Sequence, residues 1–124
     1  PESVAKIEAA RRGGLGSLEI FKAAGVKMAF GTDLLGESHR LQCDEFRIRA
    51  EVLGNLAAIQ SATLVAAEVL RMERRLGVIA PGAQADVLVL DGDPLRDISV
   101  LANHRKHLAA VMQGGRFAVN RLPA

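Results

Sequence analysis

Residues 25–38 read GVKMAFGTDLLGES, and this stretch decides the fold because an apolar run lies between a glycine stop and an acidic turn. Upstream, Ser17 can cap a short helix over 18–24 that ends at Gly25. The run at 26–30 has the length and apolar content of a buried strand. A helix, a glycine and a strand form half of a βαβ unit, so we expect an α/β fold with parallel strands.

Asp33 follows this expected strand directly. It should therefore lie just beyond the C-terminal end of the strand, at the edge where α/β proteins bind ligands. Residue types alone leave two roles equally open for Asp33. It is a turn or cap residue, or it is a cation ligand that also takes a proton from bound water. A metal ion needs roughly three or four protein ligands, so the second role requires partners.

Three further helices are expected in the first part of the chain. Ser3 can cap a helix to about Arg12, which the glycines of 13–16 should end. Apolar side chains recur at helical spacing over 43–53, and Asn55 can cap another helix that runs to about Leu70. The charged residues of the 43–53 helix that we expect to face outward are Arg47, Arg49 and Glu51.

From Gly77 onward the pattern changes to short strands and turns. Pro81-Gly82 favours a type II turn, the run at 86–90 is apolar on both faces, and Gly114-Gly115 predicts a two-residue hairpin. We therefore expect two segments, an α/β part over 1–75 and a small β part over 76–124.

Composition excludes several classes of protein. The net charge of +2 is spread along the chain and there is no Trp or Tyr, so we expect no nucleic-acid partner. No apolar run approaches the roughly 20 residues that span a bilayer, so we expect no membrane association. Cys43 is the only cysteine, which points to a reducing, cytoplasmic setting. The first residue is Pro1 rather than Met, so we expect a processed or truncated start.

The remaining polar candidates each have an ordinary alternative. His39 could face the same cleft as Asp33, or it is a solvated loop residue. Glu37 and Asp44 could pair as acid and base, but Asp44 more simply favours the positive end of the helix that follows it. Cys43 falls on an apolar helical stripe, which favours a small core residue over a reactive thiol.

His104 and His107 form the other pair with metal-ligand spacing. Their i and i+3 positions place both on one helical turn, where two imidazoles could bind a metal. Arg105 and Lys106 between them would oppose a cation. We therefore expect both histidines at the surface. No H-x-H, H-E-x-x-H or paired-cysteine motif is present in the chain.

With these residues assembled, the chain resembles the C-terminal portion of the amidohydrolase superfamily, in its imidazolonepropionase-like and prolidase-like branch. The resemblance runs from about Leu18 onward, and the segments that carry it are GVKMAFGTDLLGES (25–38), SATLVAAEVLRMERRLGVIAPGAQADVLVLDGDPLRDI (61–98) and VMQGGRFAVN (111–120). These metal-dependent enzymes cleave amide bonds, including those of dipeptides, and combine a (β/α)8 barrel with a small β-sandwich. The resemblance thus implies the last βα portion of a barrel over 1–75 and the C-terminal half of a sandwich over 76–124.

Carried over by position, GTD at 31–33 matches the end of the eighth barrel strand. The resemblance implies that Asp33 ligates the more buried metal, with zinc the expected ion, and shuttles a proton to the leaving amine. Gly31 allows close backbone approach, and Thr32 orients the carboxylate. The residues expected on the loop over the substrate are Leu34, Leu35, Ser38 and His39.

The chain also departs from the family pattern. The family's H-x-H, its bridging Lys or Glu and its two other His ligands have no counterpart here, and His39, His104 and His107 match none of them. The leading hypothesis is therefore a C-terminal fragment that neither binds a metal nor cleaves an amide alone. One alternative is a standalone, non-catalytic α/β module whose incomplete fold is completed by self-association into homo-oligomers. Another is a small independent enzyme that uses Asp33 and His39.

Overall fold

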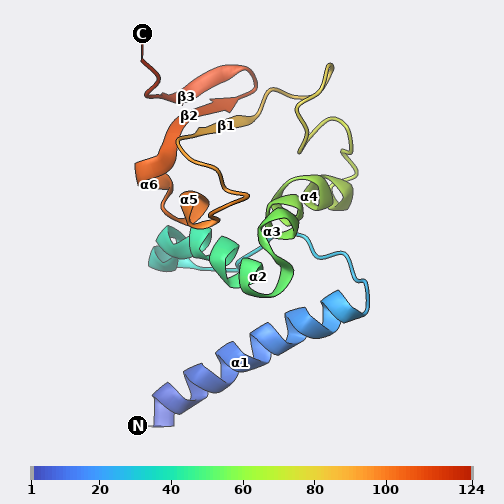
Figure 1. Ribbon diagram of the computed structural model, residues 1–124, viewed down its shortest axis with the longest axis vertical. Coiled ribbons are helices and arrows are strands. Elements are labelled where there is room, and N and C mark those ends of the chain that lie inside the picture. Colours follow the sequence, from blue (N-terminus) through green and yellow to red (C-terminus); the bar gives the residue numbers. More distant parts are fainter. Residues whose placement is uncertain (1, 124) are drawn as a thin grey trace.

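The computed structural model describes residues 2–123 and consists of a long N-terminal helix, a layer of shorter helices and a small sheet (Figure 1). The long helix α1 and the sheet lie at opposite ends of the molecule (Figure 1). The elements in chain order are α1 (Glu2–Ala23), the 3₁₀ helix η1 (Gly36–Asp44), α2 (Glu45–Leu53), α3 (Asn55–Ala62), α4 (Leu64–Val69), β1 (Val87–Leu90), α5 (Ser99–Ala102), α6 (His104–His107), β2 (Leu108–Gln113) and β3 (Arg116–Asn120). The fold is mixed α/β.

Helix α1 is continuous, so the prediction of a break at residues 13–16 was wrong. Each of the three glycines, at 13, 14 and 16, costs about 1 kcal/mol relative to alanine inside a helix, and this cost does not end the helix here. Ser17 does not cap a new helix; its hydroxyl donates a hydrogen bond to the carbonyl of Gly13, 2.9 Å away and one turn back in the same helix. The side chain of Ser3, the predicted first cap, lies outside the described side chains.

The strand expected over residues 26–30 does not form. This segment is extended chain whose described backbone hydrogen bonds outward join it to helices rather than to a strand. The Val26 N–H donates to the Phe21 carbonyl at 2.9 Å, and the Phe30 N–H donates to the Ser61 carbonyl at 2.9 Å. A parallel strand needs a neighbouring strand on which to form its hydrogen-bond ladder. The described sheet contains only antiparallel pairs, far along the chain from this segment.

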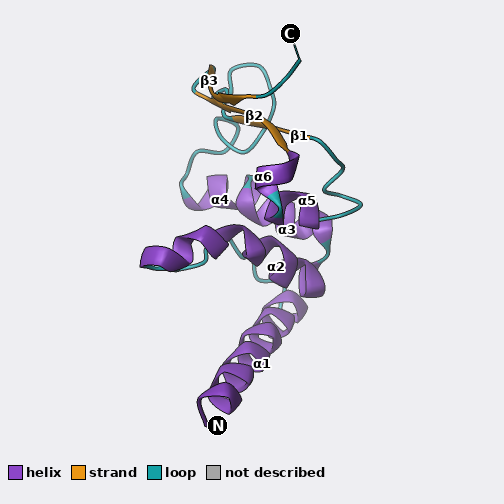
Figure 2. Cartoon of the chain, turned by 90° about the vertical axis from the view of Figure 1, so that its left-hand side faces the viewer, coloured by secondary structure: helices purple, strands orange, loops and turns teal. Residues whose placement is uncertain are grey.

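The helical layer packs α2 against α1 and α3 (Figure 2). Arg49 on α2 is buried, with 7% of its surface exposed, which contradicts the prediction that it faces outward. Burial is tolerated because the Glu45 carboxylate accepts a hydrogen bond from Arg49 Nε at 2.7 Å. The helix expected from Asn55 to Leu70 is broken at Thr63 into α3 and α4.

The sheet confirms the strands and hairpin predicted for the second segment. Its order is β1-β2-β3, with both pairs antiparallel. Gly114 and Gly115 have φ of 56° and 80°, as a type I′ hairpin turn requires. The expected turn at Pro81-Gly82 also forms, because Gly82 has φ of 84° and the Ala83 N–H donates to the Ala80 carbonyl at 3.1 Å.

The molecule exposes far more surface than a compact monomer of its size. Its accessible surface is 9032 Å², against about 6,400 Å² expected for a folded chain of 13.2 kDa. Large apolar side chains contribute to the excess: Ile79, Leu35 and Val69 are 90%, 80% and 69% exposed. Among the described residues, no helix combines the length and apolar character needed to cross a bilayer.

Candidate functional site

The segment that carries Asp33 is anchored by Phe30, three residues upstream. The Phe30 ring lies against Phe46 of α2, with centroids 4.5 Å apart, and the Arg49 guanidinium lies over it at 5.4 Å. The Phe30 N–H is bound to the carbonyl of Ser61, which is 2% exposed. Ring, cation and backbone contacts together fix the position of this segment on α2 and α3.

This anchor was not predicted from the sequence, although a signal for it exists. Glu45 and Arg49 are spaced i and i+4, the spacing of a helical ion pair, and Phe46 lies three residues before Arg49, on the same side of the helix. Charged residues of a helix usually face water, and for that reason Arg49 was predicted to face outward despite this spacing. In this structure the ion pair makes burial of Arg49 possible, and the buried Arg49 in turn covers the Phe30 ring.

Asp33 occupies a backbone conformation that few residue types adopt. Its φ is 50°, in the left-handed region that only Gly, Asn and Asp visit readily. Asp33 is exposed, and its carboxylate makes no hydrogen bond or ion pair with any described residue. It therefore neither caps a helix nor closes a turn through its side chain, which were the ordinary roles open to it.

The loop predicted to lie over a substrate begins with extended chain and continues into η1. Leu34 is half-buried and Leu35, at φ −111° and ψ 150°, is exposed. The Ser38 N–H donates to the Leu35 carbonyl at 3.2 Å, which brings these two predicted residues together. His39 is exposed on η1 and has no described hydrogen bond or ion pair with Asp33.

The other histidines are less exposed than expected. His104 and His107 are both half-buried on α6, and Nδ1 of His107 lies 2.7 Å from the Asp91 carbonyl. Nδ1 of His104 is buried without a described partner. Together these positions correct the prediction that both rings lie at the surface, because α6 packs on α5 rather than standing in solvent.

Cys43 is half-buried at the end of η1, as a packing residue would be, rather than in the following helix. Burial, and secondarily the neighbouring Asp44 carboxylate, raises the pKa of the Cys43 thiol. Such a thiol is a poor nucleophile at neutral pH. Glu37 and Asp44 lie at opposite ends of η1, and Asp44 is 3.6 Å from Arg47, so the two acids do not form a pair.

Comparison with known proteins places these features in a family. The model of the amidohydrolase family matches residues 3–117. The chain belongs to the amidohydrolase family. Within it, the chain is 57% identical to a prolidase whose crystal structure holds N-methylphosphonate-L-proline, with a TM-score of 0.87 over 98% of this chain and 30% of that one.

Two other family relatives are more distant. A Xaa-Pro dipeptidase with methionine bound in its active site is 36% identical, with a TM-score of 0.74 over 83% of this chain and 25% of that one. Adenine deaminase 4 of Rhizobium meliloti (strain 1021) is 38% identical over 68 residues, which are 55% of this chain and 11% of the deaminase. The chain thus spans less than a third of the length of each relative.

Amidohydrolases are typically metal-dependent, but the residues of this chain do not fit a metal ion by themselves. Among the side chains that the structure describes, no group of three or more His, Cys, Asp or Glu is placed to hold one. Asp33 offers one carboxylate where about three or four protein ligands are needed. As a result, no catalytic step can be built from the described residues alone.

Proposed function

We propose that this chain supplies the C-terminal part of a metal-dependent amidohydrolase that cleaves the C–N bond of dipeptide-like substrates ending in proline. The observation that carries the proposal is the 57% identity to a prolidase over 98% of this chain. The second solved relative, a Xaa-Pro dipeptidase, points to the same substrate class. Residues 1–75 would form the end of a barrel and residues 76–124 part of a β-sandwich.

Within this proposal, Asp33 is the chain's contribution to an active site that other residues complete. Its carboxylate is free of described partners, exposed, and held in a left-handed conformation beyond the Phe30 anchor. Strained backbone is found disproportionately at functional sites, which supports the assignment. In the complete site Asp33 would be one metal ligand and would carry a proton on its carboxylate, while Leu34, Leu35, Ser38 and His39 would border the substrate.

A chimera tests this role directly. The matched 30% of the prolidase would be replaced by this chain, and hydrolysis of a Xaa-Pro dipeptide measured. The chimera should turn over substrate, and Asp33→Asn should lower its rate by about 100-fold or more, since a positioned acid–base group contributes about 10²–10⁴. Asp97→Asn, which removes an exposed carboxylate of the second segment, is the matched control and should leave the rate unchanged. A full rate in Asp33→Asn would refute the assignment.

A second candidate is a standalone, non-catalytic module that self-associates. The surface of 9032 Å² exceeds the compact-monomer value by about 2,600 Å². A stable protein interface buries about 1,200–2,000 Å² in total, so this excess is large enough for one. The exposed residues that favour association include Ile79, Val69 and Leu35.

Sedimentation equilibrium distinguishes a self-associating module from a chain that remains monomeric. Self-association predicts a dimer or larger species at micromolar concentration. It also predicts that Ile79→Lys, which places a charge at an apolar side chain that is 90% exposed, shifts the equilibrium towards monomer. The exposed Arg116→Gln on β3 serves as the control. A stable monomer over the whole concentration range would exclude the module as proposed.

A further inference from the structure

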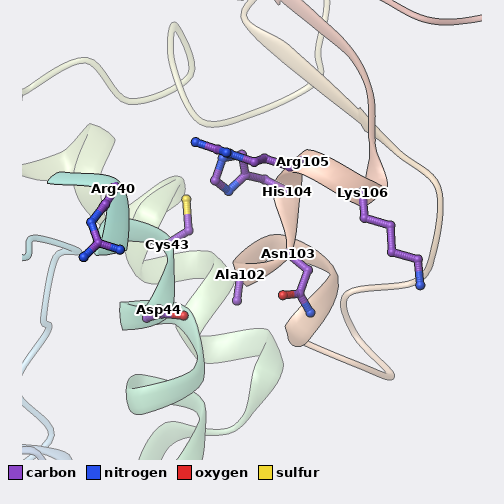
Figure 3. A pocket seen from close by; sticks show the side chains of 8 residues that line it. All are labelled: Arg40, Cys43, Asp44, Ala102, Asn103, His104, Arg105 and Lys106. Atoms are coloured by element: carbon purple, nitrogen blue, oxygen red, sulfur yellow. The ribbon is translucent and has the colours of Figure 1, made fainter. Parts of the chain in front are cut away.

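A cavity of about 330 Å³ lies between η1 and the α5–α6 pair, and it is lined by none of the residues placed at the amide-cleaving site (Figure 3). Its lining residues are Arg40, Cys43, Asp44, Ala102, Asn103, His104, Arg105 and Lys106. The cavity thus joins two segments that are about 60 residues apart in the sequence.

The cavity carries an uncompensated positive charge. Arg40, Arg105 and Lys106 bring three cations, and none of them has a described carboxylate partner. The single acid in the lining, Asp44, lies 3.6 Å from Arg47 outside the cavity and is offset by it. Clefts lined by one sign of charge focus the field and concentrate ions of the opposite sign.

The side chains around the cavity are hydrogen-bond donors as well as charges. Figure 3 shows Arg105 and His104 reaching from α6 towards Cys43 on η1, while Lys106 extends the other way. The His104 Nδ1 is buried without a described hydrogen-bond partner. Guanidinium groups present paired N–H donors that match the oxygens of phosphate.

From this arrangement we propose that the cavity binds the phosphate group of a small phosphorylated molecule. Arg40 on η1 and Arg105 on α6 donate to the phosphate oxygens from two sides, and Lys106 adds charge without contact. A volume of about 330 Å³ exceeds what a phosphate group fills, so the cavity has room for the organic part of a phosphomonoester. Inorganic phosphate presents the same oxygens as a phosphomonoester, so an experiment must distinguish these two ligands.

The test is a titration of the 124-residue chain with inorganic phosphate, glycerol 3-phosphate and acetate at constant ionic strength, followed by calorimetry and amide NMR. Saturable binding of phosphate and of glycerol 3-phosphate, but not of acetate, is expected, with shifts centred on Arg40, Cys43 and His104. Tighter binding of glycerol 3-phosphate than of phosphate identifies a phosphomonoester as the ligand. Tighter binding of phosphate, or NMR shifts spread evenly over the basic residues, overturns the proposal.

Variants assign the effect to the cavity. Arg40→Gln and Arg105→Gln should each weaken binding about tenfold or more, because each removes a charge-assisted hydrogen bond. Lys106→Gln should weaken it less than either. Arg116→Gln, which removes an exposed arginine on β3, is the matched control and should bind as the parent does. Equal losses in Arg116→Gln and Arg105→Gln would show non-specific attraction and contradict the proposal.

Discussion

Gly77 is predicted to be the least replaceable glycine between the helical layer and the sheet. It has φ of 72°, and a Cβ added there would lie 2.5 Å from the backbone oxygen and 2.6 Å from the backbone carbon of Thr63. Thr63 is the residue at which α3 ends and α4 begins, so the chain of the second segment contacts the break itself. Backbone atoms cannot move aside as a flexible side chain can.

Gly77→Ala should therefore destabilise the fold through two separable effects. A left-handed conformation costs a non-glycine residue about 1–2 kcal/mol, and overpacking against fixed atoms adds about 1–3 kcal/mol. Gly82→Ala is the matched control because Gly82 has φ of 84° but no atom within 4 Å of the added Cβ. It should show the conformational cost alone.

Urea unfolding followed by the helical circular dichroism signal measures both variants. The midpoint of Gly77→Ala should fall clearly below that of Gly82→Ala, with unchanged slopes, and the difference reports the clash with Thr63. Equal midpoints for the two variants would refute the close approach of residue 77 to the helix break.

Three further predictions concern single side chains. Glu45→Ala should destabilise the chain by about 2 kcal/mol in urea because buried Arg49 loses its partner, whereas Arg47→Gln, which breaks an exposed pair, should cost less than about 0.5 kcal/mol. Hydrogen bonds from Ser99 lower the pKa of the Asp97 carboxyl from its ordinary value of 3.8. The ionised carboxylate therefore stabilises the folded chain above pH 3.8, and this contribution is lost as the pH falls through the pKa of the folded state. Stability curves of the parent and Asp97→Asn should accordingly converge in acid, and curves that stay parallel would contradict this. Cys43 should react slowly with a disulfide reagent at pH 7.5 and much faster in urea, and equal rates would mean that burial does not protect it.

Local sequence signals predicted the second segment better than the first. The Gly114-Gly115 hairpin and the Pro81-Gly82 turn depend on φ angles that glycine alone adopts readily, and both formed as expected. Residues 87–90 also form the predicted strand, since β2 lies close enough along the chain to pair with it.

The failures occurred where the outcome depended on distant partners. The run at 26–30 has the composition of a buried strand, but the described part of the chain offers no parallel strand to pair with it. Arg49 was placed outward because its burial depends on Glu45 and on Phe30, and Phe30 lies nineteen residues away. The glycines of 13–16 failed to end α1 because a helix tolerates them at modest cost.

For the candidate site, the sequence could predict one ligand, Asp33, but not a complete metal centre. The sequence singled out Asp33 as a proposed metal ligand, but the part of the chain that the structure describes contains no group of three or more side chains that could hold a metal ion. Sequence motifs identify single ligands, whereas a metal centre is defined by ligands brought together from several elements.

The most direct test of this account is the metal content and activity of the purified chain after dialysis against zinc. We predict much less than one zinc per chain by mass spectrometry and no hydrolysis of a Xaa-Pro dipeptide, because one carboxylate cannot hold the ion. One tightly bound zinc per chain, with dipeptide turnover that Asp33→Asn abolishes, would show that the chain assembles a complete site alone and would contradict the account.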